Sequence, residues 1–404
     1  MKRKVLLLLL LLLLGALLLA IPAGAEKAED ISEACTFTTD EYARKVGRLT
    51  NRNYESYWQS GKRENPYLII SSEQSMHTLY LSFRELPESY EIQKKVDGKW
   101  TAFMEGDARF HHVSYDLAGE KEIRIWSTQK GKHRLILNEV YVFGAGEAPG
   151  WVQHWEETEE KADLMLLVAH PDDELLFFAG LLPTYASEMQ KKVVVVYLTY
   201  SDKGRRSEAL DGLWTAGVRH YPVFGPFQDK YCEKLKDAYN SGNKKKVLAW
   251  ITELFRKYQP EVVVTHGLKG EYGHGQHKMM ADACIQGYDL AADASYDSQS
   301  AAEYGTWEVK KLYIHQYRDE DGDCLHMAWD TPLQSLGGKT GMEIAEEAFS
   351  KHVSQTGLSF NVGGYHKPLC VTITGVYYEN TDFGLYATRV GPDAAKNDFL
   401  EHIE

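Results

Sequence analysis

Apolar and polar positions change their pattern along the chain, and each pattern predicts a different class of structure. From Cys35 to about Gly146 the apolar residues form short runs, rich in β-branched and aromatic side chains and separated by Gly, Pro, Asn or Asp. Strands are expected at Tyr67–Ser71, His77–Phe83, Tyr90–Gln93, Glu122–Trp126 and Leu135–Phe143. Short strands at this spacing predict an all-β sandwich over residues 35–146.

A second pattern, alternating strands and helices, follows the acidic stretch Glu156–Glu160. Its near-continuous apolar strands are typical of parallel sheets that are buried on both faces. Strands are expected at Asp163–Ala169, Val193–Thr199, Glu261–Thr265 and Lys311–His315, and helices at Glu174–Met189, Arg205–Gly217, Lys244–Tyr258 and Gln276–Leu290. We therefore predict an α/β domain over residues 160–404, with a doubly wound, Rossmann-like and mostly parallel sheet flanked by helices.

The first 25 residues depart from both patterns. Three basic residues precede an unbroken apolar run from Val5 to Ile21, and Ala23-Gly-Ala25 offers a small-x-small cleavage site. This pattern predicts a secretory signal peptide over residues 1–25, and hence a protein that is secreted or held in the cell envelope. An uncleaved membrane anchor is the alternative, because the apolar run is near the lower length limit for a membrane span. The polar residues 26–34 are expected to form a linker.

Composition and charge narrow the range of functions. Apolar residues make up 44% and charged residues 25% of the chain, which is the balance of a globular protein. Cleavage of the signal would change the formal net charge from −13 to −16, because the segment holds three cationic residues and no acidic one. Nucleic-acid phosphates are bound by basic patches, so no nucleic-acid partner is expected for this acidic chain.

The cysteines are widely scattered and contain no Cys-x-x-Cys pair. They are Cys35, Cys232, Cys284, Cys324 and Cys370. An exported protein could form one or two disulfides from them, but an odd number leaves at least one free thiol, and spacing does not assign the pairs. A metal site built on thiolates is therefore not expected.

Two segments rich in His and Asp follow two of the expected strands. His170-Pro-Asp-Asp-Glu174 comes directly after Asp163–Ala169, and Gly270–His277 follows Glu261–Thr265. In an open parallel sheet, ligands bind beyond the carboxyl ends of the strands. The two segments are therefore expected to converge at one edge of the sheet.

The residue types in these segments fit a catalytic zinc site, which needs three His or carboxylate ligands and a fourth position open to water. His170, Asp173 and one of His274 or His277 supply such a set, although the residues alone do not decide which of Asp172 and Asp173 binds metal. The remaining carboxylate could accept a proton from the water. The remaining histidine could stabilise an oxyanion or protonate a leaving amine.

Both segments also resemble the motifs of a known family. Ala169-His-Pro-Asp-Asp-Glu174 resembles the signature of the PIG-L/LmbE family of zinc-dependent N-acetylglucosamine deacetylases. Tyr272-Gly-His-Gly-Gln-His277 is similar to its second motif, usually Gly-His-Pro-Asp-His. By position, the resemblance implies that His170, Asp173 and His277 bind the metal and that Asp172 is the general base. It also implies that His274 polarises the oxyanion or acts as an acid, and that Tyr272 is a mobile tyrosine that contacts the intermediate.

The resemblance spans roughly residues 162–290 and has two departures. Arg205-Arg-Ser-Glu208 is like the family's Arg-x-x-Glu helix and implies that Arg205 binds a sugar hydroxyl, whereas an exposed helix arginine is the alternative. Ala216 replaces a leucine in the following turn, and Gly275-Gln276 replaces Pro-Asp in the second motif. The missing acid at position 276 is expected to loosen the support of His277.

Four other features have both a structural and a functional interpretation. Glu174 fits a group that supports the metal site, and equally an acidic residue favoured by the helix dipole. His266 and His315 lie at strand ends, near enough to support the site, and are expected to be packed. Asp382–Thr388 is expected to cover the sheet edge or the substrate groove.

The expected sandwich shows no catalytic constellation. The segments Asn53–Trp58 and Leu137–Phe143 resemble a discoidin-like or galactose-binding-like module, which implies a role in binding carbohydrate. Its tryptophans Trp58, Trp100 and Trp126 fit sugar contacts and fit core positions equally well.

These observations predict a reaction. We expect metal-dependent hydrolysis of the N-acetyl group of an N-acetylglucosamine-containing glycan or glycoconjugate outside the cytoplasm, with release of acetate. The expected cofactor is Zn²⁺, and Fe²⁺ or another divalent ion also fits His and carboxylate ligands. The alternatives are a zinc hydrolase of another amide or ester, and a non-catalytic glycan-binding surface protein.

Overall fold

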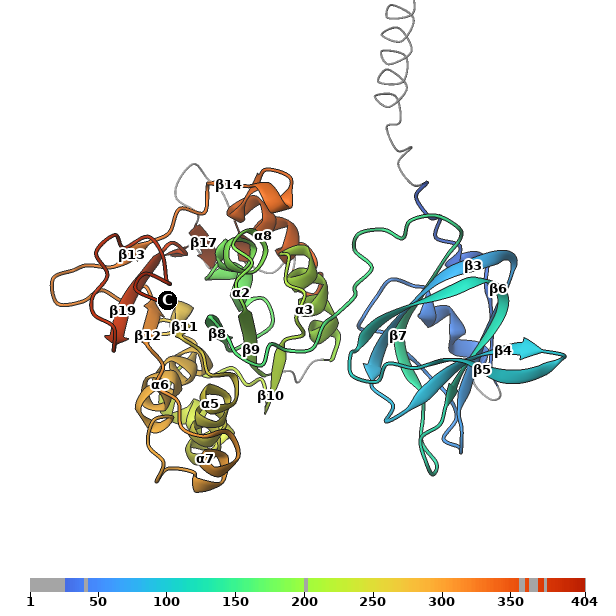
Figure 1. Ribbon diagram of the computed structural model, residues 1–404, viewed down its shortest axis with the longest axis horizontal. Coiled ribbons are helices and arrows are strands. Elements are labelled where there is room, and N and C mark those ends of the chain that lie inside the picture. The colour runs from blue at the N-terminus through green and yellow to red at the C-terminus, as the bar shows by residue number, and fades with distance from the viewer. Residues whose placement is uncertain are drawn as a thin grey trace, which may run out of the picture. The chain divides into compact units, whose positions relative to one another are not determined.

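The computed structural model describes residues 26–39, 43–199, 203–355, 360–362, 370–373 and 376–403 (Figure 1). The expected signal peptide lies outside these residues, and none of the helices within them is long and apolar enough to cross a membrane. The chain divides into two compact units. Among the described residues, unit 1 comprises those within 26–52, 57–109 and 113–152, and unit 2 those within 53–56, 110–112 and 153–403.

Unit 1 is built on an antiparallel β-sheet. Its strands are β1 (Thr36–Thr38), β2 (Trp58–Gln59), β3 (Tyr67–Glu85), β4 (Tyr90–Val96), β5 (Lys99–Glu105), β6 (His112–Ser127) and β7 (Ile136–Phe143), with 3-10 helices η1 (Ser32–Ala34) and η2 (Ala43–Leu49). The strand order is β2-β7-β3-β6-β4-β5, and β1 pairs with β3. The strands surround a core that includes Leu79, Ile92 and Leu137, all fully buried.

The predicted all-β unit before the α/β unit is confirmed, with corrections to its strands. The expected strands Tyr67–Ser71 and His77–Phe83 are parts of the single strand β3. Strand β5 was not predicted, because Lys99–Glu105 has few β-branched residues. Trp58 is fully buried in the core, whereas Trp100 and Trp126 are half-buried.

Residues 26–34 do not form the expected linker. Lys27 forms a backbone bridge with Glu147, and Asp30 forms one with Phe143. Ile31 is buried, so this polar segment is anchored on unit 1 by its few apolar side chains and by its backbone.

Unit 2 contains the mostly parallel sheet that the sequence predicts, in the order β10-β9-β8-β11-β12-β19-β13. Its parallel strands are β8 (Leu164–Val168), β9 (Val193–Thr199), β10 (Val223–Phe227), β11 (Val262–Thr265) and β12 (Lys311–His315). Strand β19 (Asp382–Thr388) is antiparallel to both of its neighbours, β12 and β13 (Leu325–His326). Asp382–Thr388, which was expected to cover the sheet edge or the groove, is therefore a strand within the sheet.

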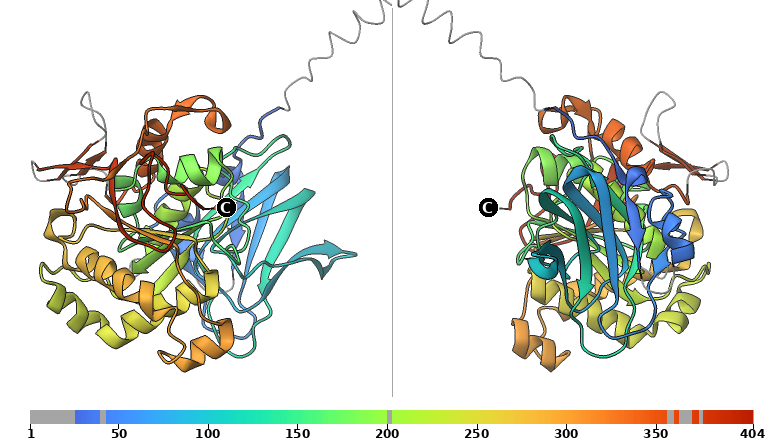
Figure 2. Two further views of the ribbon diagram at one scale, coloured as in Figure 1. Left: turned by 60° about the vertical axis from the view of Figure 1, so that its left-hand side comes forward. Right: turned by 90° about the vertical axis from the view of Figure 1, so that its right-hand side faces the viewer.

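Helices lie on both faces of this sheet (Figure 1). On one face are α4 (Leu235–Gly242), α5 (Lys244–Tyr258), α6 (Gly275–Leu290) and α7 (Ser298–Tyr304); on the other are α2 (Asp173–Leu176), α3 (Lys203–Thr215) and α8 (Gly341–Phe349). Figure 2 shows α5 and α6, in yellow and orange, side by side. Met165 and Leu167 of β8 join the core beneath these two helices, so the alternate residues of β8 face the opposite layer.

The expected helix Glu174–Met189 is interrupted. Helix α2 ends at Leu176, and a π-helix, η3, occupies Pro183–Glu188. Pro183 has no N–H to continue an α-helical ladder. The chain turns at Ala179, which has a positive φ of 37°, and the adjacent Gly180 packs so closely on Trp329 that an added Cβ would lie 2.8 Å from the indole ring.

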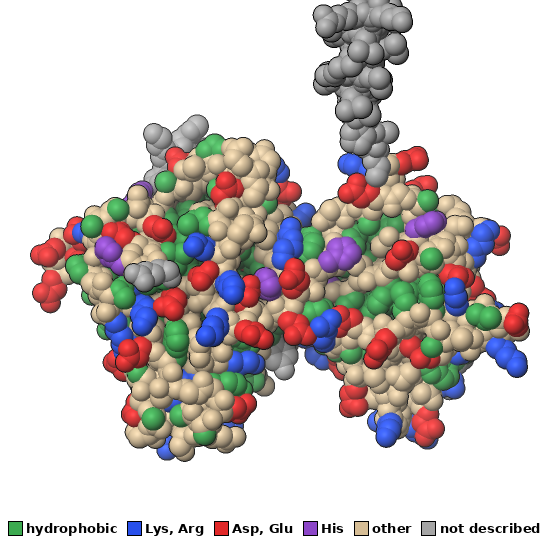
Figure 3. Space-filling model, in the orientation of Figure 1, with side chains coloured by type: hydrophobic (Ala, Val, Ile, Leu, Met, Phe, Trp, Pro, Cys, Tyr) green, Lys and Arg blue, Asp and Glu red, His purple; other side chains and the backbone are tan. Residues whose placement is uncertain are grey.

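Smaller elements complete unit 2. They are β14 (Pro332–Leu333), β15 (Lys339–Thr340), β16 (Phe360–Val362), β17 (Cys370–Ile373), β18 (Val376–Glu379) and the 3-10 helices η4 (Glu271–Gly273) and η5 (Gln334–Leu336). Cys35, Cys232, Cys284 and Cys324 are free thiols, and the side chain of Cys370 lies outside the described residues. Acidic and basic side chains are interspersed on the face shown in Figure 3.

Candidate metal centre

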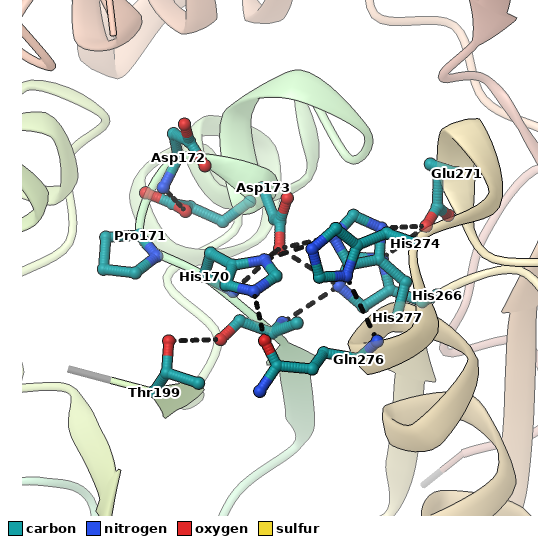
Figure 4. A network of polar contacts seen from close by, with 12 residues as sticks. His170, Pro171, Asp172, Asp173, Thr199, His266, Glu271, His274, Gln276 and His277 are labelled. Atoms are coloured by element: carbon teal, nitrogen blue, oxygen red, sulfur yellow. Dashed lines mark hydrogen bonds and ion pairs between the residues drawn. The ribbon is translucent and has the colours of Figure 1, made fainter. Parts of the chain in front are cut away.

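The His- and Asp-rich segments leave the sheet at adjacent strand ends. Strands β8 and β11 are parallel neighbours, with Leu164 opposite Val262 and Leu167 opposite Thr265. One segment follows β8 and enters α2, and the other follows β11 and enters α6. The two segments therefore meet at the carboxyl edge of the sheet, where their side chains point toward one another (Figure 4).

A strained turn presents the first segment. Asp172 precedes α2 with φ of 112°, a backbone region that residues with a side chain rarely adopt. Its N–H donates to Oε2 of Glu174 at 2.9 Å, and Glu174 is fully buried. Glu174 therefore holds the turn from which Asp172 and Asp173 extend, which favours the supporting role over that of an exposed helix-dipole residue.

Three side-chain atoms form a nearly equilateral triangle at this edge. Nδ1 of His170 lies 3.2 Å from Oδ2 of Asp173 and 3.2 Å from Nε2 of His277. Nε2 of His277 lies 3.3 Å from the same Asp173 oxygen. All three side chains are buried, and they come from the two segments singled out by the sequence.

This triangle fits a divalent metal ion. Ligand atoms held at about 2.0–2.1 Å from a tetrahedral zinc ion are about 3.3 Å apart, which matches the three observed separations. Two imidazoles and one carboxylate are also a ligand set of catalytic zinc sites. The cluster can therefore hold a metal ion, and its donor types do not determine which one.

Two further histidines lie close to the triangle. Two overlapping sets of three residues have ligand atoms close enough to one another to hold an ion. One set is His170, His274 and His277, and the other is Asp173, His266 and His277. However, Nε2 of His266 accepts the N–H of Ala169 at 3.0 Å, and Nδ1 lies 2.7 Å from Glu271. Both ring nitrogens of His266 are engaged, so this residue is packed beside the cluster, as the sequence led us to expect.

Glu271 organises these histidines and was not identified from the sequence. Its Oε2 lies 2.7 Å from Nδ1 of His266 and 2.9 Å from Nδ1 of His277, and its Oε1 lies 2.6 Å from Nδ1 of His315. Burial opposes ionisation, but the histidines hold the pKa of Glu271 well below its usual value. The carboxylate therefore keeps the proton of His277 on Nδ1 and its Nε2 free to bind metal.

Gln276 supports a different histidine from the one expected. Its Oε1 lies 3.0 Å from Nε2 of His170, which leaves Nδ1 of that ring facing Asp173 and His277. The expectation that Gln276 loosens the support of His277 was wrong, because Glu271 holds His277 from a neighbouring turn. The signal for Glu271 in the sequence is an acidic residue directly before the second motif.

Asp172 and Arg205 form a buried ion pair. Nη2 of Arg205 lies 2.9 Å from Oδ2 of Asp172, and the guanidinium also donates to the carbonyl of Pro171. The Arg205 side chain is 15% exposed, so it is not the solvated helix arginine of the alternative interpretation. Burial raises the pKa of Asp172 to about 7, and Arg205 opposes that rise. A carboxyl group that titrates near neutral pH is suited to proton transfer.

His274 and Tyr272 border the triangle. Burial, together with His170 and His277, lowers the pKa of His274 to about 2, so its ring is neutral at pH 7. Because Nδ1 of His274 accepts the N–H of Gln276 at 3.1 Å, its proton is on Nε2 and available for donation. The centroid of the Tyr272 ring lies 5.5 Å from the ring centroid of His274 and 5.2 Å from that of His277. Burial raises the pKa of the Tyr272 hydroxyl.

Comparison with known proteins gives a sequence match over this region. Residues 165–288 match the PIG-L family, described as GlcNAc-PI de-N-acetylase. A 1D-myo-inositol 2-acetamido-2-deoxy-alpha-D-glucopyranoside deacetylase of Frankia casuarinae is 24% identical over 37% of this chain and 57% of its own length. A deacetylase of the same description from Saccharopolyspora erythraea is 30% identical over 37% of this chain and 63% of its own length. The chain thus spans less than two thirds of these two relatives.

Solved structures show weaker likenesses. The N,N'-diacetylchitobiose deacetylase of Pyrococcus horikoshii aligns with 48% of this chain and 71% of its own, at 18% identity and a TM-score of 0.36. The family 32 CBM of C. perfringens NanJ aligns with 29% of this chain and 98% of its own, at 14% identity and a TM-score of 0.24. The match in sequence over residues 165–288, rather than either structural likeness, therefore bears on function.

Proposed function

We propose that this protein is a metal-dependent deacetylase of an N-acetylglucosamine-containing glycan or glycoconjugate outside the cytoplasm, because residues 165–288 match the PIG-L family. The reaction is hydrolysis of an acetamide, which releases acetate and leaves a free amine on the sugar. The observation that carries the proposal is the buried triangle of His170, Asp173 and His277, next to which Asp172 is held by Arg205 at 2.9 Å.

His170, Asp173 and His277 are the residues that would hold the metal. Zinc is the proposed ion, and Fe²⁺ fits the same donors. When bound, such an ion polarises the acetyl carbonyl and lowers the pKa of water to near neutrality. Glu271 and Gln276 keep the two imidazoles in the tautomers that this role requires, because each accepts the proton of the nitrogen that does not face the triangle.

Asp172 is the proposed base and acid of the reaction. Its carboxylate accepts a proton from the attacking water as the new bond to the acetyl carbon forms. The protonated carboxyl then passes that proton to the sugar nitrogen as the carbon–nitrogen bond breaks, so that acetate and the free amine result. Arg205, paired with Asp172 at 2.9 Å, holds the carboxylate in position and favours its ionised form.

His274 is proposed to stabilise negative charge on the acetyl oxygen. Its ring is neutral at pH 7, with the proton on Nε2, so it can donate a hydrogen bond as that charge develops. Of the two roles that the family resemblance implied for His274, we assign polarisation, because its Nδ1 accepts the N–H of Gln276 and its Nε2 proton is left to be donated, and we assign the acid role to Asp172.

Export and glycan targeting belong to the same proposal. The basic residues before Val5–Ile21 and the Ala23-Gly-Ala25 motif support cleavage and export. An exported enzyme would meet envelope or extracellular glycans. Unit 1, with half-buried aromatic side chains such as Trp100 and Trp126, would then serve as a module that directs the enzyme to its substrate.

An acetate-release assay tests the proposal. N-acetylglucosamine glycosides and oligosaccharides are incubated with the full chain, with and without a chelator, and then with added zinc. We expect acetate release that the chelator abolishes and the metal restores. Release from acetylated peptides or esters, with none from the sugars, would contradict the substrate class. Release that survives complete removal of the metal would contradict the metal centre.

A further inference from the structure

A short segment after β10, residues 228–234, is fastened to the first turn of α6. The side-chain amide of Gln276 donates to the carbonyl of Gln228 at 2.8 Å, and its oxygen accepts the N–H of Lys230 at 3.1 Å. The N–H of Gly275 donates to the carbonyl of Cys232 at 2.6 Å. The two residues that depart from the usual Pro-Asp of the second motif therefore both hold this segment, and Lys278 adds a hydrogen bond from its Nζ to the carbonyl of Glu233 at 2.7 Å.

Gly275 is required by the approach of the segment. A Cβ at this position would lie 2.6 Å from Sγ of Cys232 and 2.9 Å from its carbonyl oxygen, closer than real Cβ contacts. A proline would meet the same atoms and would also lack the N–H that Cys232 accepts. The Gly-Gln pair is therefore fitted to the 228–234 segment, which explains the departure in structural terms.

The segment presents two side chains to the metal centre. Oδ1 of Asp229 lies 3.5 Å from Nε2 of His170, and its Oδ2 lies 3.6 Å from Arg205. The ring of Tyr231 lies edge-on to His274, with ring centroids 5.2 Å apart and an interplanar angle of 79°. Tyr231 is 65% exposed, although most aromatic side chains of this unit are buried. A large aromatic ring is therefore held next to a proposed catalytic histidine with most of its surface in water.

Such a ring offers a rigid apolar surface with little conformational entropy to lose on binding. A pyranose ring has a face of C–H groups that packs on an aromatic ring, whereas its hydroxyls need polar partners such as Asp229 and Arg205. We propose that residues 228–234 form the sugar-binding wall of the site, and that Tyr231 stacks on the pyranose ring that carries the acetamido group. This inference rests on the proposed function and adds to that function the residue that selects a sugar.

The test compares Tyr231→Ala with Tyr231→Phe, and uses Tyr386→Ala as a control because Tyr386 is an exposed tyrosine on β19 of the same unit. Binding of methyl glucosaminide, the deacetylated product, to the metal-free protein is measured by saturation-transfer NMR titration. We expect Tyr231→Ala to weaken binding roughly five- to tenfold. Tyr231→Phe, which keeps the ring, is expected to restore affinity to within about twofold, and Tyr386→Ala to bind as the wild type does.

A second measurement separates this inference from the proposed function. Acetate release is compared between methyl N-acetylglucosaminide and N-acetylethanolamine, an acetamide without a ring. We expect the ratio of kcat/KM for the sugar to that for the acyclic compound to fall roughly tenfold in Tyr231→Ala. Unchanged sugar binding, or an unchanged ratio, would overturn the stacking role. If the wild type released no acetate, the deacetylase proposal would fail, and the binding titration would still decide whether Tyr231 contacts a sugar.

Discussion

Glu271 lies 2.9 Å from Nδ1 of His277 and thereby directs Nε2 of that imidazole toward His170 and Asp173. The same carboxylate lies within hydrogen-bonding distance of His266 and His315. One buried acid thus fixes the orientation of His277 in the triangle and of two histidines behind it. The metal centre therefore depends on a residue that would not itself touch the ion.

Glu271→Gln should weaken metal binding. The amide keeps the volume of the side chain but removes the negative charge that favours the Nδ1 protons of the histidines. Loss of such a supporting partner typically lowers metal affinity about 10- to 100-fold. Competition titration with a chromophoric chelator measures the Kd for zinc. Glu303→Gln, at an exposed position of α7, is the matched control, and equal Kd values for the two variants would contradict the role of Glu271.

Asp172→Asn should separate metal binding from turnover. Asp172 is not a corner of the triangle, so the variant should bind zinc with an affinity close to that of the wild type. It loses the group that accepts the water proton, and kcat should fall by about 10²- to 10⁴-fold. Metal content by elemental analysis and kcat from acetate release check the two parts. A variant with full turnover would remove Asp172 from the mechanism.

Arg205→Gln should shift the pH dependence of the reaction. A base works in its deprotonated form, so activity falls as the pH decreases through the pKa of Asp172, which burial raises to about 7. Arg205 favours the carboxylate and opposes that rise. Without its charge the pKa should increase, and the acid limb of kcat/KM should move to higher pH by roughly one unit or more.

Arg219→Gln provides the matched control for that pH profile, because Arg219 stacks on Trp214 within the same unit, at 3.9 Å from the ring centre. Its acid limb should coincide with that of the wild type. An acid limb that stays in place in Arg205→Gln, or moves to lower pH, would show that Arg205 does not act on the ionisation of Asp172.

The sequence predicted those parts of the fold whose causes are local. Val193–Thr199 is an unbroken apolar run, and the strand β9 coincides with it. The expected helix Lys244–Tyr258 coincides with α5, since its pattern of buried residues follows one helical face. The convergence of the two His-rich segments followed from a general property of parallel sheets, and it required no knowledge of the side chains between them.

What the sequence did not predict depends on contacts between distant residues. The helix expected from Glu174 is interrupted at Ala179, with its φ of 37°, next to Gly180, which packs on Trp329, a residue almost 150 positions further along the chain. Glu271 is an ordinary acidic loop residue until three histidines surround it. Similarly, Gln276 was expected to affect His277, but its amide reaches His170 and the 228–234 segment, and neither contact follows from its position in the motif.

Gln276→Glu should keep the contacts of this side chain with His170 and Lys230 and disrupt its contact with the carbonyl of Gln228. One carboxylate oxygen can still accept from His170 and from the N–H of Lys230, so the Kd for zinc should stay within about threefold of the wild type. The second oxygen takes the place of a donor and faces the carbonyl of Gln228, where two acceptors repel each other. The 228–234 segment should loosen, which faster amide hydrogen exchange in that segment would show, and binding of methyl glucosaminide should weaken. Gln286→Glu, on the same helix α6, controls for the added charge, and unchanged exchange in Gln276→Glu would show that the amide does not hold the segment.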